Sequence, residues 1–166
     1  MDRLILLTGN DGSGKDTVAK LLTHRIKDSY ITNIKKTCVK LYKDLVGVDW
    51  NELNGAEKRI HRPVFSNMCE GIKVTLGKGV FAEKTSDDIA VYPAQDKIFI
   101  IPDLRFVEEY EVFLANFKVI LVEVRRTKHS LIRDNMKEHT DWYIENTSDK
   151  KELEKEVDEF VKKFSF

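Results

Sequence analysis

Cysteine is scarce in this chain of 166 residues, which contains only Cys38 and Cys69. Two cysteines are too few for a disulfide framework or for a zinc site built on thiolates, so we expect two buried thiols in a reducing compartment. Long apolar runs are missing as well, since no segment approaches the roughly 20 residues that a membrane helix needs. Because Met1-Asp2-Arg3 leads directly into a strand pattern, we expect neither a secretory signal nor a membrane anchor.

The chain also lacks net charge, because 28 lysines and arginines balance 28 aspartates and glutamates. Without a basic field, we expect no nucleic-acid polymer as a partner. Low-complexity linkers and internal repeats are missing too, and the length suits one domain, which we assign to residues 1–166. These absences favour a small cytoplasmic protein with a full hydrophobic core.

The most informative segment that is present runs from Gly9 to Thr17 and reads Gly-Asn-Asp-Gly-Ser-Gly-Lys-Asp-Thr. It matches the phosphate-binding loop (P-loop) pattern, and it lies between an apolar strand pattern and a helix pattern. Glycines let backbone N–H groups converge on phosphate oxygens, and the helix N-terminus adds partial positive charge. A glycine-rich turn that binds nothing is the alternative. We expect these residues to bind the phosphates of ATP, with Lys15 also catalytic at the β- and γ-phosphates: Asp11, Gly12, Ser13, Gly14, Lys15, Asp16 and Thr17.

One position departs from the usual P-loop, where a serine or threonine hydroxyl follows the lysine and holds Mg²⁺. Here Asp16 stands at that position. A carboxylate suits Mg²⁺ directly or through a water, so Asp16 is a candidate metal ligand. Alternatively, Asp16 is an acid that favours the first turn of a helix. The departure separates this chain from GTPases and most motor ATPases.

Strand and helix patterns alternate along the chain, which predicts an α/β fold with helices on both faces of a sheet. Together with the P-loop, this indicates a three-layer α/β/α P-loop kinase fold with a mostly parallel five-stranded sheet. Within it we expect a helical acceptor-binding insert at about 42–96, with a surface hairpin or loop near 84–95, and a short lid at about 125–139. The expected strands are 3–7, 37–41, 97–101, 119–124 and 142–144, and the expected helices are about 15–27, 56–76, 107–116 and 149–164.

A second chemical centre follows the apolar strand that ends in Ile101-Pro102. Ligands in parallel sheets bind at the carboxyl ends of strands, so Asp103 is expected beside the P-loop. There it would hold Mg²⁺ through water or orient the attacking group, and Arg105 would point into the same catalytic site. The alternatives are a helix N-cap for Asp103 and a surface ion pair with Glu108 or Glu109 for Arg105.

The fourth expected strand ends at Arg125 and Arg126. Because phosphoryl transfer spreads negative charge over the moving group, arginines near it commonly neutralise that charge. We therefore assign Arg125 a catalytic role. For Arg126 and Arg133 the pattern does not decide between this role and a solvated basic loop.

These segments resemble the phage-type deoxynucleoside monophosphate kinases. The resemblance is carried by the Gly-Lys-Asp-Thr ending of the P-loop and by Asp103-Leu-Arg-Phe106 with Glu109 and Glu111 after it. Weaker similar blocks lie at 40–48, 62–68, 124–125 and 144–149. A His-x-Ser-Glu-like segment frequent in that family is replaced here by residues 138–141, and the chain is short for the group.

The resemblance implies transfer of the γ-phosphate of ATP to a deoxynucleoside monophosphate in the presence of Mg²⁺. It implies that the acceptor phosphate is held by Lys43, Arg62 and Arg105, and that Arg125 serves the lid. It also implies that adenine is flanked by Asn146, Thr147 and Ser148. The expected partners are therefore small nucleotides in the cytoplasm, which is the host cytoplasm if the chain is phage-encoded.

Two alternatives to this function remain at the level of sequence. The first is a P-loop kinase for another small acceptor, such as a sugar or an acid, because only the acceptor insert distinguishes these enzymes. The second is a nucleotide-binding switch, which is disfavoured because the chain has no Asn-Lys-x-Asp segment for guanine. Base preference, the choice between ribose and deoxyribose, and the oligomeric state, including a homodimer, stay open.

Overall fold

The five strands of the structure form one parallel sheet in the order β2-β3-β1-β4-β5. The computed structural model describes residues 3–91, 97–126, 134–147 and 149–166. In the centre, Leu6 of β1 lies between Ile101 of β3 and Leu121 of β4. The strands are β1 (Arg3–Thr8), β2 (Ser29–Ile31), β3 (Ile98–Ile101), β4 (Lys118–Arg125) and β5 (Trp142–Glu145). The sequence predicted a mostly parallel sheet, and all described pairings are parallel.

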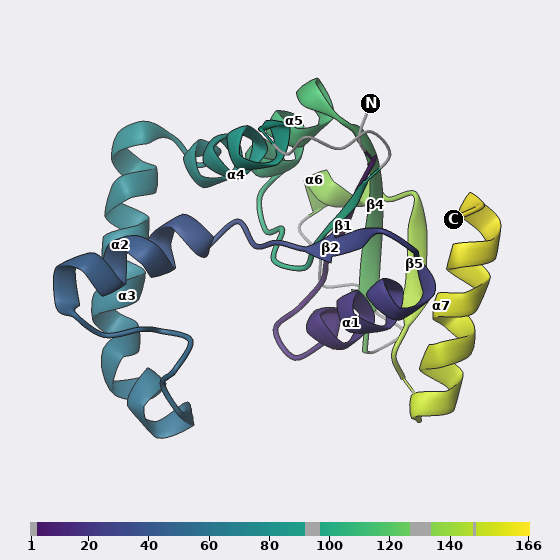
Figure 1. Cartoon of the computed structure of the whole chain (residues 1–166), viewed down its shortest axis with the longest axis horizontal. Helices are drawn as coiled ribbons and strands as arrows, with labels where there is room; N and C mark the ends of the chain where they lie inside the picture. The colour runs from purple at the N-terminus through teal and green to yellow at the C-terminus, as the bar shows by residue number, and fades with distance from the viewer. Residues whose placement is uncertain (1–2, 92–96, 127–133, 148) are drawn as a thin grey trace.

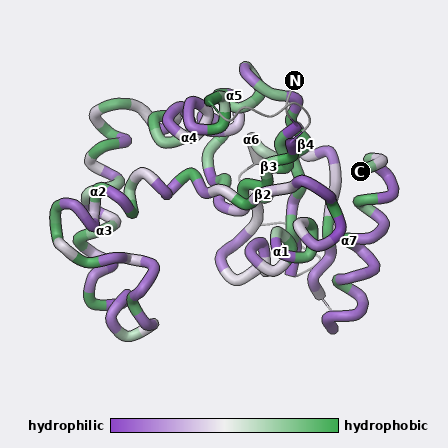
Figure 2. The backbone as a smooth tube through the Cα atoms, in the orientation of Figure 1, coloured by the Kyte–Doolittle hydropathy of each residue, from purple (hydrophilic) through white to green (hydrophobic). Residues whose placement is uncertain are grey.

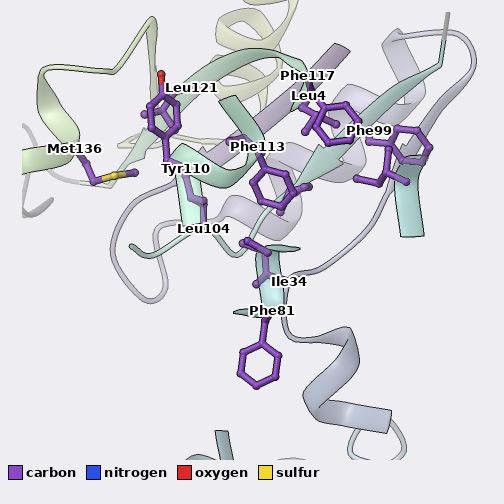
Figure 3. Close-up of a cluster of buried hydrophobic side chains, with 14 of the residues drawn as sticks. Leu4, Ile34, Phe81, Phe99, Leu104, Tyr110, Phe113, Phe117, Leu121 and Met136 are labelled. Atoms are coloured by element: carbon purple, nitrogen blue, oxygen red, sulfur yellow. The ribbon is translucent and has the colours of Figure 1, made fainter. Parts of the chain in front are cut away.

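Both faces of the sheet are buried, because successive side chains of a strand point to opposite faces. Leu4 and Leu6 of β1 belong to one hydrophobic cluster, and Ile5 and Leu7 belong to the other. The first cluster includes side chains of α4 (Val80–Ala90) and α5 (Val107–Asn116), and Figure 3 shows Phe81 and Phe113 in it. The second is covered by α1 (Lys15–Arg25) and α7 (Lys150–Phe164). The three-layer α/β/α prediction is confirmed.

Two helices, α2 (Lys36–Val46) and α3 (Gly55–Leu76), form an arm that stands away from the sheet (Figure 1). Asn54 caps α3 by accepting from the N–H groups of Ala56 and Glu57. Aromatic rings hold the arm together, since Trp50 stacks on Phe65 with ring centroids 4.1 Å apart. No residue of α3 is fully buried, and Figure 2 shows hydrophobic positions along the arm as well as in the sheet.

The expectation of two free thiols is wrong, because Cys38 of α2 and Cys69 of α3 form a disulfide with their Cα atoms 6.1 Å apart. Two cysteines are too few for a framework of several disulfides, but they are enough for a single disulfide. The bridge joins the two helices of the arm on the side where they pack together.

Two sequence-based element assignments are also wrong. Residues 37–41 begin α2 instead of forming a strand, and the second strand is the short β2 earlier in the chain. The apolar residues around Val39 suggested a strand, but Cys38 and Tyr42, four residues apart, are the buried face of a helix. The hairpin or loop expected near 84–95 is replaced as far as Ala90 by α4, and residues 92–96 lie outside the described residues.

The remaining helix, α6 (Asp134–Lys137), lies in the region expected to form the lid. Its Met136 is buried in the first hydrophobic cluster (Figure 3). The preceding lid residues 127–133, including Arg133, lie outside the described residues. Among the helices of the described ranges, none is both long enough and apolar enough to cross a membrane.

Candidate nucleotide-binding site

The P-loop connects β1 to α1 and requires glycine at three positions with positive φ. These are Gly9 (φ 138°), Gly12 (φ 77°) and Gly14 (φ 97°), and Gly14 is the N-cap of α1. The loop is also tightly enclosed, because a Cβ on Gly9 would meet the carbonyl oxygen of Val124. The N–H groups of the first turn of α1 have no partner within the helix, so they are available to an anion.

Lys15 is the cation of this loop, as the sequence predicted. Its Nζ donates to the carbonyl oxygens of Gly9 and Asn10, each at 2.8 Å. Partial burial lowers the pKa of Lys15, while the nearby carboxylate of Asp11 acts in the opposite direction. The ammonium is thus held at the loop by two neutral carbonyls, which phosphate oxygens can replace with a gain in charge complementarity.

Arg105 reaches the P-loop from the neighbouring strand. It follows β3, which pairs with β1, and its guanidinium lies 3.3 Å from the Oδ1 atom of Asp11. Both side chains are largely exposed, with 66% of Arg105 and 88% of Asp11 accessible, so this ion pair contributes little to stability. The ion pair instead places the exposed guanidinium of Arg105 beside the expected phosphate site. The structure thus brings together residues that are 94 positions apart in the sequence.

Asp103 lies at the same edge, but its carboxylate is engaged by the backbone. Its two oxygens accept from the N–H groups of Ile34 at 2.9 Å and Lys35 at 3.1 Å. Burial raises the pKa of Asp103, and these two hydrogen bonds oppose that shift. The alternative predicted from the sequence was an N-cap of the helix after β3. The carboxylate instead holds the turn that leads into α2, which begins at Lys36.

The expected metal ligands are Asp16 and Asp103. Asp16 is exposed in the first turn of α1. Across the part of the chain that the structure describes, no group of three or more His, Cys, Asp or Glu side chains is arranged for a metal ion. Mg²⁺ in phosphate sites is commonly held by one or two carboxylates together with substrate phosphates and waters. An exposed carboxylate next to the P-loop lysine therefore fits Mg²⁺, whereas both Asp103 oxygens already have partners.

Of the two arginines that end β4, the structure brings Arg126 to the P-loop. Its Nη1 donates to the carbonyl oxygen of Gly12 at 3.0 Å. The guanidinium of Arg125 instead donates to buried Glu123 at 2.8 Å and lies 3.6 Å from the ring centroid of Tyr143. Strand alternation was the signal that separates them, because Arg125 shares a face with Glu123 and its neighbour does not. The catalytic role expected of Arg125 stays a prediction, to be tested against the same role for Arg126.

Asn146 joins the end of β5 to the P-loop. Its side-chain amide donates to the carbonyl oxygen of Ser13 at 2.8 Å and occupies the place where a Cβ on Gly14 would lie. This side chain supports the shape of the loop, a role that the sequence did not suggest. Thr147 is exposed beside it, and Ser148 lies outside the described residues. The expected contact with adenine stays a prediction for all three.

The structure does not bring the expected acceptor residues of the arm to the P-loop. Lys43 of α2 donates a hydrogen bond to the carboxylate of Asp49 at 2.9 Å, and this interaction raises the pKa of Lys43. Arg62 is exposed on α3, eleven residues before Lys73. Eleven residues are close to three helical turns, so both side chains share one face of α3. The Nζ atom of Lys73 lies 4.8 Å from the ring centroid of Phe106, so this face is turned toward the loop after β3.

Glu109 is a buried carboxylate that the sequence named without assigning it a role at the site. Its Oε2 accepts from the N–H groups of Arg105 at 2.9 Å and Phe106 at 3.1 Å, and the residue is 3% exposed. Burial raises its pKa to about 7, against the two backbone hydrogen bonds and the charge of Lys73. A glutamate three residues into a helix that follows an apolar strand was the available signal.

The structure is similar to solved P-loop kinases over nearly its whole length. APS kinase CysC of Mycobacterium tuberculosis, in complex with AMPPNP and APS, covers 99% of this chain and 98% of its own, with a TM-score of 0.57 and 9% identity. The Cys556Ala mutant of that kinase gives a TM-score of 0.53 at 11% identity, again with 99% and 98% covered. Shikimate kinase of Aquifex aeolicus gives 0.48 at 13% identity, with 98% of both chains covered.

At the level of sequence, no family model matches the chain and no curated protein does either. The likeness to solved structures therefore concerns the fold. The sheet order, the parallel strands and the P-loop between β1 and α1 define the P-loop kinase fold.

Proposed function

We propose that this protein is a nucleoside monophosphate kinase that transfers the γ-phosphate of ATP to a deoxynucleoside monophosphate. The observation that carries the proposal is the convergence of three cations on one P-loop. Lys15 bonds to the loop carbonyls, Arg126 donates to Gly12, and Arg105 reaches Asp11. Phosphoryl transfer relies on positioning and on neutralising charge, and these residues supply both.

The chemistry assigned to each cation follows from its position. Lys15 leaves its two carbonyl partners and binds the β- and γ-phosphates of ATP, supported by the N-terminus of α1. Arg126 approaches from the end of β4, and Arg105 approaches from the end of β3 on the other side of β1. The two guanidinium groups therefore flank the transferred group from opposite neighbours of the central strand. When bound, Mg²⁺ would supply positive charge that neutralises the phosphates, and exposed Asp16 is the residue that would hold it.

The acceptor is assigned to the space between the P-loop and the arm. Arg62 lies on the same face of α3 as Lys73, and that face is turned toward Phe106. A monophosphate dianion needs several fixed donors, and arginine grips it with two parallel hydrogen bonds. Because Arg62 lies about 16 Å along the helix axis from Lys73, closure of the arm is required to bring it to a phosphate beside Arg105. Lys43 would leave Asp49 in the same movement.

Transfer to another anionic acceptor is the second candidate function. The arm presents cations, which suit a sulfate, a carboxylate or a phosphate equally well. The preference for a nucleotide rests on the sequence resemblance to phage-type deoxynucleoside monophosphate kinases, and the same resemblance supports a phage origin and action in the host cytoplasm.

An acceptor panel tests the proposal. The purified chain is incubated with ATP, Mg²⁺ and each deoxynucleoside and ribonucleoside monophosphate in turn, and ADP formation is followed. APS, shikimate and simple sugars are included as competing acceptor classes. We expect turnover with at least one deoxynucleoside monophosphate well above the rate without acceptor. Activity confined to a sugar, an acid or APS would overturn the nucleotide assignment while leaving the kinase assignment in place.

A further inference from the structure

The loop from Asp103 to Phe106 links the acceptor arm to the P-loop. At one end, the guanidinium of Arg105 lies 3.3 Å from Asp11 of the P-loop. At the other end, the ammonium group of Lys73 lies 4.8 Å from the ring centroid of Phe106, so α3 of the arm contacts this loop through Lys73. These two adjacent residues therefore contact the two parts of the molecule that must meet when phosphate is transferred.

A single carboxylate fixes the backbone of both residues. Oε2 of Glu109 accepts from the N–H of Arg105 at 2.9 Å and from the N–H of Phe106 at 3.1 Å. Glu109 lies on α5, whose Phe113 is fully buried against the sheet, so the carboxylate is anchored to the rigid part of the fold. An exposed acid is sufficient to cap a helix, but Glu109 is only 3% exposed.

We propose that Glu109 is a positioning residue for phosphoryl transfer, which sets Arg105 at the P-loop and Phe106 under the arm through two backbone hydrogen bonds. This inference rests on the proposed function. Glu109 touches neither substrate and acts through the loop from Asp103 to Phe106, which contacts both the P-loop and the arm. Without the two bonds, the peptide units of Arg105 and Phe106 are free to rotate, and the guanidinium samples positions away from Asp11.

A positioning role for Glu109 predicts a non-additive effect on turnover. If Glu109 acts through Arg105, its removal costs little once Arg105 is already absent, because contributions that pass through one residue are not additive. A residue that only stabilises α5 lowers the melting temperature and leaves turnover per folded molecule unchanged in both backgrounds. The two roles are thus distinguished by a double-mutant cycle.

The experiment measures kcat and KM for ATP and for the best acceptor in wild type, Glu109→Ala, Arg105→Ala and the double variant. We expect Glu109→Ala to lower kcat/KM for the acceptor about tenfold or more, and to change the KM for ATP less than threefold. The same substitution in the Arg105→Ala background is expected to cost less than about threefold. Glu109→Gln keeps an acceptor oxygen at the same length and is expected to recover most of the loss.

Two further variants complete the test, and three outcomes decide it. Glu109→Asp keeps the charge but withdraws the oxygen by one methylene, so it replaces Glu109→Ala in the cycle if the alanine variant does not fold. Glu111→Gln, on the same helix and exposed, is the matched control and is expected to match wild type. Equal losses from Glu109 removal in both backgrounds, or unchanged turnover with a lower melting temperature, would overturn the inference. An inactive wild-type protein would instead overturn the proposed function.

Discussion

We predict that Glu109→Gln changes how the free energy of unfolding depends on pH. The ordinary pKa of a glutamate is 4.5, and burial raises that of Glu109 to about 7. Between these values the folded state binds more protons than the unfolded state, so the free energy of unfolding falls as the pH rises. The contribution is fully present below pH 4.5 and is lost as the pH rises through 7.

The magnitude follows from the size of the shift. A difference of this size between folded and unfolded states corresponds to at most about 3.5 kcal/mol, because each pKa unit is worth about 1.4 kcal/mol. The charges that face the carboxylate from other elements are Lys73 of α3, which lowers its pKa, and Asp103, which raises it. Both act in the wild type, and glutamine removes only the titration of Glu109 itself.

Urea unfolding between pH 4 and pH 8 measures the effect. We expect the wild type to lose about 2 to 3 kcal/mol relative to Glu109→Gln over this range, while exposed Glu111→Gln follows the wild-type curve. Parallel curves for wild type and Glu109→Gln would refute the argument that burial dominates the electrostatics of this carboxylate.

The remaining predictions concern turnover. Asp103→Asn is expected to lower kcat more than it raises the KM for ATP, together with a lower melting temperature, because the carboxylate holds the N–H groups at the start of α2; unchanged turnover per folded molecule would leave it a structural cap. Arg126→Ala is expected to lower kcat by about tenfold to a thousandfold, since its guanidinium reaches the P-loop. Arg125→Ala is expected to act mainly on stability by leaving buried Glu123 unpaired. Kinetics and thermal melting of both variants decide this, and the reverse pattern would favour Arg125 as the catalytic residue. Arg62→Ala and Arg105→Ala are expected to raise the KM for the acceptor much more than the KM for ATP, as steady-state kinetics with each substrate varied in turn will show; equal increases would place these arginines on ATP.

Much of the fold could be predicted from the sequence, because its signals are local and repeated. The apolar run of β3 and the glycines of the P-loop each identify their own structure without reference to distant residues. The second strand could not be found in this way. It is three residues long and lies at the edge of the sheet, so its apolar pattern is weaker than that of the helix that follows it.

The candidate site was predictable to the extent that strand order places residues together. Asp103 and Arg105 follow β3, which lies beside β1, so their approach to the P-loop follows from topology. The hydrogen-bond partners of each side chain could not be predicted from strand order. Asp103 accepts from the turn before α2, Asn146 donates to the P-loop, and Glu109 accepts from the loop after β3. These hydrogen bonds depend on how the helices pack against the sheet.

The measurement that tests the central claim most directly compares wild type with Lys15→Ala for ADP formation from ATP and a deoxynucleoside monophosphate. Among the described residues, the Nζ atom of Lys15 donates only to loop carbonyls, so removing this side chain is expected to leave the fold intact. A positioned cation at the transferred phosphate is worth on the order of a thousandfold or more in rate. The account predicts acceptor-dependent turnover in wild type and a loss of that size in a folded Lys15→Ala variant. Near-normal turnover in that variant would contradict the assignment of this P-loop as the catalytic site.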